Sequence, residues 1–135
     1  MDGSIKLGDF GLGKVLTHLK EDEVKGYVGT PSYSSPEAST KLVQVGPKTD
    51  IFSLGILVYL LVDLKFPFIK PYDQNYYMLL RMIREVEPTL VTRDISQPFL
   101  NLISFMLMKD PEMRPSTKEI LALELVQPYK GEMDE

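Results

Sequence analysis

One long apolar run dominates the hydrophobic pattern of this chain. It extends over Ile51–Val62 (IFSLGILVYLLV) and is bounded by Asp50 and Asp63. Its length, its leucine content and the preceding capping candidates Thr49 and Asp50 favour a helix over a strand. Because the run is apolar on every side, we expect a central helix wrapped by other helices. Its twelve residues are too few to cross a membrane, which takes ~20 in a helix.

Three further segments have helical patterns. Between residues 73 and 86, apolar side chains recur at positions i, i+3, i+4 and i+7, which indicates an amphipathic helix. These side chains are Tyr76, Leu79, Leu80 and Ile83. Pro98 begins another apolar segment, which we expect to be helical to about Met108. Ser116 and Glu119 have the spacing of a capping box and predict a last helix that ends near Gln127.

The N-terminal third has a different pattern. Residues 4–8 (SIKLG) alternate apolar and polar side chains, which predicts a short β-strand that ends at Asp9. Residues 12–34 are rich in turn-forming residues and predict a long loop. Residues 35–37 (SPE) have the order of a helix start. The predicted fold class is therefore mainly α, with one short strand, a long loop and about five helical segments.

Composition excludes several classes of protein. The chain has 135 residues and a formal net charge of −4, which suits one domain or part of one and argues against a nucleic-acid binder. Without cysteine it has no disulfide, cysteine zinc site or catalytic thiol, and we expect its single histidine, His18, to face solvent. The opening residues lack the features of a secretory signal. We therefore expect a cytoplasmic or nuclear protein with no membrane partner.

Four short motifs follow one another along the chain. They are DFG at residues 9–11, GTPSYSSPE at 29–37, DIFSLG at 50–55 and DPEMRPS at 110–116. The first motif alone carries little information, because turns with an acid, an aromatic residue and a glycine are common. The occurrence of all four in this order is much more specific.

In this order the motifs resemble the C-terminal lobe of the eukaryotic protein kinases of the serine/threonine type. The stretches IKLGDFGLGKVL and YVGTPSYSSPE are most similar to the NIMA-related kinases. The resemblance implies a partial kinase domain at 1–127, an activation segment at about 9–37 and a short acidic tail at 128–135. It also implies ATP and Mg²⁺ as cofactors and a protein substrate with Ser or Thr acceptors.

The resemblance assigns expected roles to the residues of the first two motifs. Asp9 would bind the Mg²⁺ that bridges the β- and γ-phosphates of ATP. Phe10 would pack in the core, and Gly11 would permit the backbone turn. Thr30 would correspond to the threonine that contacts the catalytic aspartate and marks serine/threonine specificity.

Three further residues would be structural rather than catalytic. Glu37 would form a buried ion pair with Arg114. Asp50 would hold the catalytic loop through backbone N–H groups, a role that is compatible with capping the central helix. Phe52 stands where relatives usually carry tryptophan, which is a conservative change of core residue.

Several parts of the kinase machinery are missing from this chain. The catalytic loop HRDxxxxN precedes DFG in active kinases, but only eight residues precede Asp9. The Gly-rich loop and the β3 lysine are missing as well. Gly26 stands where many relatives carry an activating phosphorylation site, and Thr17, Tyr27 and Ser32 are weaker acceptor candidates. We therefore expect the isolated chain to be inactive.

Two functions are compatible with these observations. The chain is either part of a serine/threonine kinase that transfers the γ-phosphate of ATP to proteins, or a non-catalytic interaction module with a kinase-like lobe. In both cases the segment that normally covers the central helix is absent from the sequence. We therefore expect apolar surface at Ile51–Val62, which would bind a partner or make the isolated chain poorly soluble.

Overall fold

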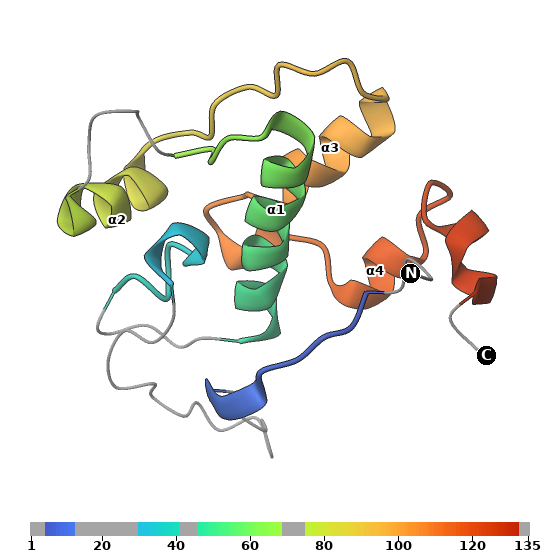
Figure 1. The fold of residues 1–135 in the computed structure, drawn as a ribbon, viewed down its shortest axis with the longest axis horizontal. Helices are drawn as coiled ribbons and strands as arrows, with labels where there is room; N and C mark the ends of the chain where they lie inside the picture. Colours follow the sequence, from blue (N-terminus) through green and yellow to red (C-terminus); the bar gives the residue numbers. More distant parts are fainter. Residues whose placement is uncertain (1–4, 13–29, 41–45, 69–74, 133–135) are drawn as a thin grey trace.

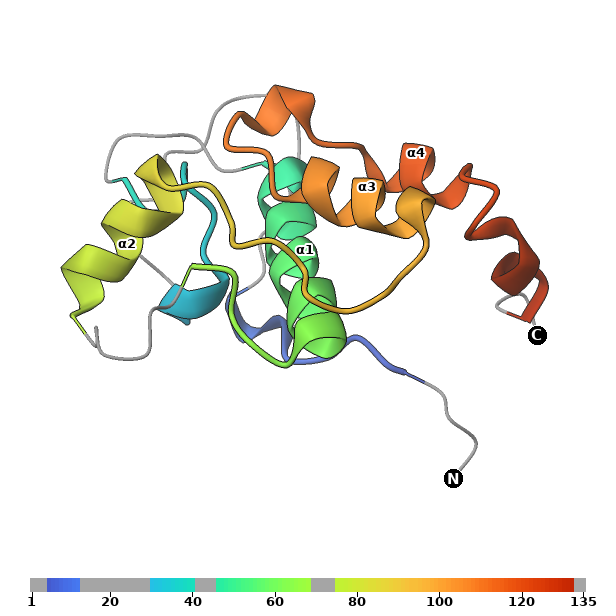
Figure 2. The same cartoon turned by 90° about the horizontal axis from the view of Figure 1, so that it is seen from above.

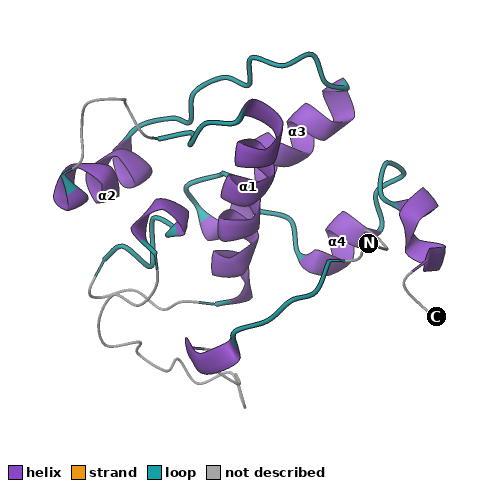
Figure 3. Ribbon diagram, in the orientation of Figure 1, coloured by secondary structure: helices purple, strands orange, loops and turns teal. Residues whose placement is uncertain are grey.

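The regular structure of this chain consists of helices. The computed structural model describes residues 5–12, 30–40, 46–68 and 75–132. These ranges contain no strand (Figure 3). The elements are, in chain order, η1 (Phe10–Leu12), η2 (Pro31–Tyr33), α1 (Pro47–Asp63), α2 (Tyr76–Glu85), α3 (Gln97–Met106), η3 (Pro111–Met113), α4 (Thr117–Leu121) and η4 (Gln127–Glu132).

Helix α1 is the centre of the fold. α3 packs along one side of α1 (Figures 1 and 2). α2 and α4 lie on opposite sides of α1, further from it than α3 (Figure 1). α1 contributes Phe52, Ile56 and Tyr59 to the main core, and all three are almost fully buried. Ile83 of α2 and Ile103 of α3 complete this core. The predicted central helix is confirmed.

The start of α1 differs from the prediction. The helix begins at Pro47, so Gly46 is the N-cap residue and neither Thr49 nor Asp50 caps it. Proline suits the first helical position because its ring presets φ and no N–H is lost from the helix ladder. Asp50 instead lies in the first turn, where a negative charge is favourable near the positive end of the helix dipole.

α1 and α3 approach each other closely at Gly55. A Cβ atom added there would lie 2.9 Å from Met106 Cβ and 3.0 Å from Leu107 Cδ2. Such distances are below ordinary van der Waals contact, so a larger side chain at this position would push the two helices apart. The glycine therefore sets the spacing between α1 and α3 in the core.

The other helical predictions have mixed outcomes. The amphipathic helix is present as α2, whose N-cap Asn75 accepts a hydrogen bond from the Tyr77 backbone N–H at 2.9 Å. The segment from Pro98 is present as α3. The capping box at Ser116 is formed, but α4 ends at Leu121 and not near Gln127. Residues 122–126 form turns and a bend instead, and Leu125 packs with Ile120 against Ile51, Leu102 and Met106.

Two predictions in the N-terminal third are only partly met. Residues 5–8 are extended but form no strand, and Ile5 and Leu7 are exposed. A strand needs a neighbour for its N–H and C=O groups, and the described residues offer none. At Ser35 a single helical turn forms, with the Ser35 hydroxyl accepting from the Ala38 backbone N–H at 3.3 Å. Residues 41–45, which would continue this turn, lie outside the described residues.

One face of α1 is not covered by the described helices. Leu54, Leu57 and Leu61 are exposed, so the helices that pack around α1 do not enclose it. The expectation of apolar surface on the run at 51–62 is met. Among the residues that the structure describes, no helix is both long and apolar enough to span a membrane.

The close approach at Gly55 leads to a stability prediction. Gly55→Ala should lower the free energy of unfolding by about 1–3 kcal/mol, because overpacking of α3 outweighs the gain in helix propensity. Chemical denaturation followed by circular dichroism measures this change. Gly8→Ala is the matched control, since no atom lies within 4 Å of an added Cβ there. A Gly55→Ala protein as stable as the parent would contradict the close packing.

Candidate functional site

Asp9 lies at a tight backbone turn just before η1. Its φ is 59°, in the left-handed region that aspartate tolerates better than most residues. Gly11 follows within η1, and its expected role of permitting the backbone turn stays a prediction. A Cβ at Gly11 would lie 3.6 Å from Asp9 Oδ1, which is ordinary contact. The turn leaves the Asp9 carboxylate exposed to solvent.

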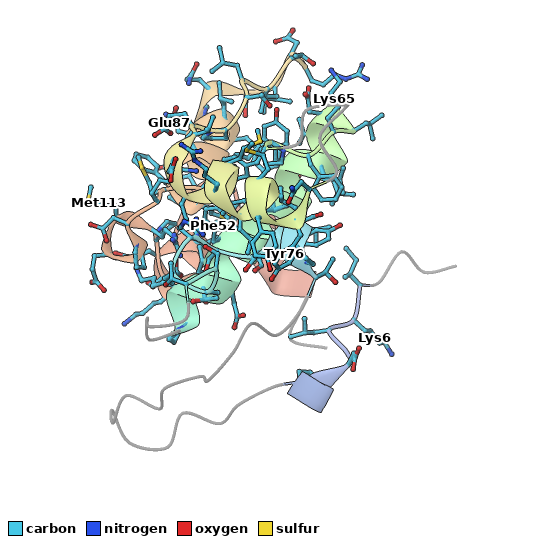
Figure 4. The ribbon with its side chains drawn as sticks, turned by 90° about the vertical axis from the view of Figure 1, so that its left-hand side faces the viewer. Lys6, Phe52, Lys65, Tyr76, Glu87 and Met113 are labelled. Carbon is cyan, nitrogen blue, oxygen red and sulfur yellow. The ribbon has the colours of Figure 1, made fainter. Side chains whose placement is uncertain are left out.

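Phe10 does not pack in the core, contrary to the prediction. Its side chain is 68% exposed. The segment to which it belongs lies away from the packed helices, as the positions of Lys6 and Phe52 show (Figure 4). The core built by α1, α2 and α3 is already filled by their own side chains. The described residues therefore provide no apolar pocket for Phe10.

The described residues supply one candidate ligand for Mg²⁺. Mg²⁺ typically binds one or two carboxylates and completes its shell with phosphate and water oxygens, which fits the exposed carboxylate of Asp9. No cluster of three or more acidic or histidine side chains occurs in the described ranges. Thr30 is exposed at the start of η2, and its side chain caps no N–H group. The metal role of Asp9 and the specificity role of Thr30 stay predictions.

Glu37 and Arg114 form the buried ion pair that the sequence predicts. Arg114 Nη1 lies 2.7 Å from Glu37 Oε1, and Arg114 Nη2 lies 2.8 Å from Glu37 Oε2. Both side chains are buried, and the two parallel bonds give the bidentate geometry in which arginine binds carboxylates most strongly. The pair joins residues that are 77 positions apart in sequence.

The guanidinium of Arg114 has every donor paired. Nε donates to the carbonyl of Met108 at 2.7 Å, and the remaining N–H groups donate to the carbonyls of Lys48 and Lys109, each at 2.9 Å. With the two bonds to Glu37, all five N–H donors of the side chain are used. A buried charge is tolerated when it is paired in this way.

Neighbouring groups of α1 complete the site around the pair. The Thr49 hydroxyl donates to Glu37 Oε1 at 2.9 Å, and the Lys48 amine donates to the carbonyl of Arg114. Burial raises the pKa of Glu37, but bonds from Arg114, its own backbone N–H and Thr49, with the positive charge of Arg114, outweigh it. The pKa is therefore below its ordinary value. The sequence indicated Thr49 only as a capping candidate, and nothing in it distinguished Lys48 from an ordinary residue in the first turn of a helix.

Aromatic rings connect this pair to the core. The Arg114 guanidinium carbon lies 4.8 Å from the centre of the Phe52 ring, and Phe52 stacks on Phe68 at 6.1 Å. Lys109 Nζ lies 4.0 Å from the centre of the Phe68 ring and donates to the carbonyl of Ile83 at 2.6 Å. Burial lowers the pKa of Lys109 to about 8. Two cations therefore flank one stacked pair of rings.

Asp50 has no hydrogen-bond partner among the described residues. Its side chain is exposed in the first turn of α1. The expected role of holding a catalytic loop needs backbone N–H groups that the described residues do not bring near it. This role stays a prediction, as do the positions of Thr17, His18, Gly26 and Tyr27, which lie outside the described residues.

A second polar network at the end of α1 was not predicted. The Asp63 carboxylate is buried and accepts from the Thr92 backbone N–H at 2.8 Å and from its hydroxyl at 2.5 Å. These two bonds hold the pKa of Asp63 below its ordinary value. The Tyr59 hydroxyl contacts the Thr89 hydroxyl at 2.8 Å. In the sequence Asp63 only marks the end of an apolar run, so nothing indicated that it would be buried.

A cavity of about 500 Å³ lies between α3 and α4. Its lining includes Leu102 and Phe105 of α3, Leu123 and Leu125 from the segment after α4, and Arg114. Asp9 and Thr30 do not line it. The cavity is therefore separate from the residues expected to bind a metal–nucleotide complex.

The buried pair leads to a second prediction. Glu37→Gln should lower the free energy of unfolding by about 3–5 kcal/mol, because it leaves the buried Arg114 charge uncompensated. Denaturant unfolding at neutral pH measures this loss. Glu85→Gln is the matched control, since Arg81 and Glu85 form a solvent-exposed ion pair whose loss should leave the free energy of unfolding nearly unchanged. Equal effects of the two substitutions would contradict the proposed importance of the buried pair.

The same variant should change the dependence of stability on pH. The pKa of Glu37 is lower in the folded chain than its ordinary value of 4.5. Its stabilising contribution is therefore complete above the unfolded-state pKa and is lost as the pH falls through the folded-state pKa. The parent chain should lose stability below pH 4.5 more steeply than Glu37→Gln. Parallel curves of unfolding free energy against pH would refute this assignment.

Known proteins resemble this chain over almost its whole length. Residues 1–126 match the family model for the protein kinase domain. The chain is 40% identical to serine/threonine-protein kinase Nek3 of Oryza sativa subsp. japonica, covering 98% of this chain and 22% of that protein. It is 36% identical to G2-specific protein kinase nim-1 of Neurospora crassa, covering 98% of this chain and 15% of that protein. The chain thus spans less than a quarter of these two relatives. It belongs to the protein kinase domain family, with similarity to the NIMA-related serine/threonine kinases.

Proposed function

We propose that this chain is the C-terminal-lobe portion of a serine/threonine protein kinase, which transfers the γ-phosphate of ATP to Ser or Thr hydroxyls of proteins. The observation that carries the proposal is the fully bonded Glu37–Arg114 pair. It fixes the segment after Thr30 to the first turn of α1, where a kinase would need a rigid platform for its protein substrate. Family membership supports the same conclusion.

Asp9 is the residue of this chain that would hold the metal. Bound Mg²⁺ would neutralise the charge of the ATP phosphates during transfer. Asp9 offers an exposed carboxylate at a fixed backbone turn, so it can approach such a complex without unfolding a buried site. Thr30 is exposed on the segment that the buried pair holds, and we propose that it lies near the acceptor hydroxyl.

The 135-residue chain alone should not transfer phosphate. Phosphoryl transfer depends on positioning of both reactants and on electrostatic stabilisation of the transferring group. Its sequence carries no HRDxxxxN catalytic loop, Gly-rich loop or β3 lysine. One carboxylate cannot replace these groups, so we propose that the activity needs the rest of a longer kinase polypeptide.

The proposal predicts the effect of one substitution. The polypeptide that carries this chain, recovered from its own cells with an antibody, should transfer phosphate from Mg²⁺-ATP to Ser or Thr of a protein acceptor. Asp9→Asn should reduce this rate by about 10²-fold or more, since it removes the metal-binding charge. Asparagine also tolerates a left-handed backbone, so the turn at residue 9 should persist. Radiolabelled ATP and phosphoamino-acid analysis measure both results.

Asp94→Asn is the matched control, because it removes an exposed carboxylate outside the candidate site. It should leave the rate unchanged. A recovered polypeptide that transfers no phosphate, or an Asp9→Asn protein as active as the control, would contradict the proposed function. Transfer by the isolated 135-residue chain would contradict its proposed dependence on a longer polypeptide.

A further inference from the structure

Arg84 connects α2 to the helical turn at residues 35–40. Its guanidinium donates from Nη1 to the hydroxyl oxygen of Ser39 at 3.3 Å, across 45 positions of sequence. α2 lies beside the segment 30–40 in both views of the ribbon (Figures 1 and 2). Both partners are described residues, so the contact is formed within this chain and needs no further segment to complete it.

The positive charge of Arg84 is not balanced by a carboxylate of the described residues. Arg81 and Arg114 each form an ion pair with a glutamate. Arg84 is partly buried and, within the part of the chain that the structure describes, donates only to Ser39. Its place in the last turn of α2 suits the helix dipole, but the dipole does not direct its side chain towards Ser39. The guanidinium therefore contacts a neutral oxygen where an anion would be the stronger partner.

The Ser39 side chain can carry such an anion. It is partly exposed, and its hydroxyl donates to the carbonyl of Pro36 at 2.6 Å. The backbone around it is a single turn, in which the Ser39 N–H donates to the carbonyls of Ser35 and Pro36 at 3.1 and 3.3 Å. Opening one such turn costs little compared with unfolding the core, so the hydroxyl can reach an enzyme. A phosphate on this oxygen would add close to two negative charges and three acceptor oxygens, which fit the forked donors of arginine.

The neighbouring carboxylates already have their own partners. Glu37 lies two residues before Ser39, but the buried ion pair occupies both of its oxygens. Glu85 follows Arg84 in the sequence and accepts from Arg81 Nε at 2.7 Å. A phosphate at Ser39 would therefore meet one uncompensated cation and two carboxylates whose charges are paired.

We propose that Ser39 is a phosphorylation site and that Arg84 binds its phosphate. Another serine/threonine kinase supplies the group from ATP. The Ser39 oxygen loses its proton and bonds to the γ-phosphorus, the bond from that phosphorus to the bridging oxygen of the β-phosphate breaks, and ADP leaves.

The modification exchanges one contact of Ser39 for another. The ester oxygen has no proton to donate, so the bond to the Pro36 carbonyl is lost and the phosphate pairs with Arg84. This ion pair then ties α2 to the turn that follows Glu37. The proposal concerns a phosphate carried by the chain and does not depend on phosphoryl transfer by the chain itself.

Mass spectrometry of the natural protein tests the modification. The polypeptide that carries this chain is recovered from its own cells with phosphatase inhibitors and digested with trypsin. Cleavage after Lys25 and Lys41 releases residues 26–41, and fragment ions should place a phosphate on Ser39. Phosphatase treatment before digestion is the control and should remove the added mass. A peptide without phosphate, or with phosphate only on its other hydroxyls, would overturn the proposal.

Phosphorus NMR tests the role of Arg84. The 135-residue chain is made with phosphoserine at position 39, and the pKa of its phosphate is read from the chemical shift against pH. The nearby guanidinium should hold this pKa below its ordinary value of about 6. Arg84→Gln should return the pKa to that value. Arg81→Gln is the matched control, because it removes an arginine of the same helix that is already paired, and it should keep the low pKa.

Two outcomes of the NMR experiment contradict the binding role of Arg84. One is a phosphate pKa that does not respond to Arg84→Gln, and the other is an equal response to Arg81→Gln. Circular dichroism of each phosphorylated chain verifies that the helices persist. Loss of the helical signal on phosphorylation of the parent sequence would also overturn the proposal, because the fold would then not accommodate the phosphate.

Discussion

The burial of one arginine constrains much of this structure. A guanidinium can leave water only when its charge and its N–H groups find partners, and Arg114 finds all of them. Its partners are a carboxylate and three carbonyls from otherwise separate parts of the chain. Because these acceptors must converge within hydrogen-bond distance, they fix the segment around Glu37, the first turn of α1 and the turn before η3 together. The hydrogen-bond acceptors that the buried Arg114 guanidinium requires therefore order the surrounding loops.

Local patterns predicted the elements whose stability is local. The leucine-rich run predicted α1, and the i, i+3, i+4 spacing predicted α2. The order of the motifs predicted that Glu37 and Arg114 pair, although they are far apart in sequence. The strand at 4–8 and the burial of Phe10 depended on neighbours that the described residues do not supply. The hydrophobic pattern of a single segment does not show whether a neighbouring strand or an apolar pocket is present.

The burial of polar groups was harder to predict than the burial of apolar ones. Asp63 looked like a boundary residue, but it is buried because the backbone of Thr92 and its hydroxyl satisfy its carboxylate. The apolar run does not indicate which face of α1 stays exposed, because its residues are similar on all sides. Which face is covered depends on Gly55, whose missing side chain lets α3 approach on that side alone.

The separation of 77 positions between Glu37 and Arg114 affects the order in which the protein folds during its synthesis. On a ribosome the chain emerges N-terminus first, so Glu37 is made long before Arg114, with which it forms its buried ion pair. Closing so long a loop is slow compared with forming a helix turn, because many chain conformations must be searched. α1 and α2 can form while synthesis continues, whereas the segment around Glu37 waits for Arg114. Its ordering is therefore among the last steps of folding, and a ribosome that stops before Arg114 releases a chain without it.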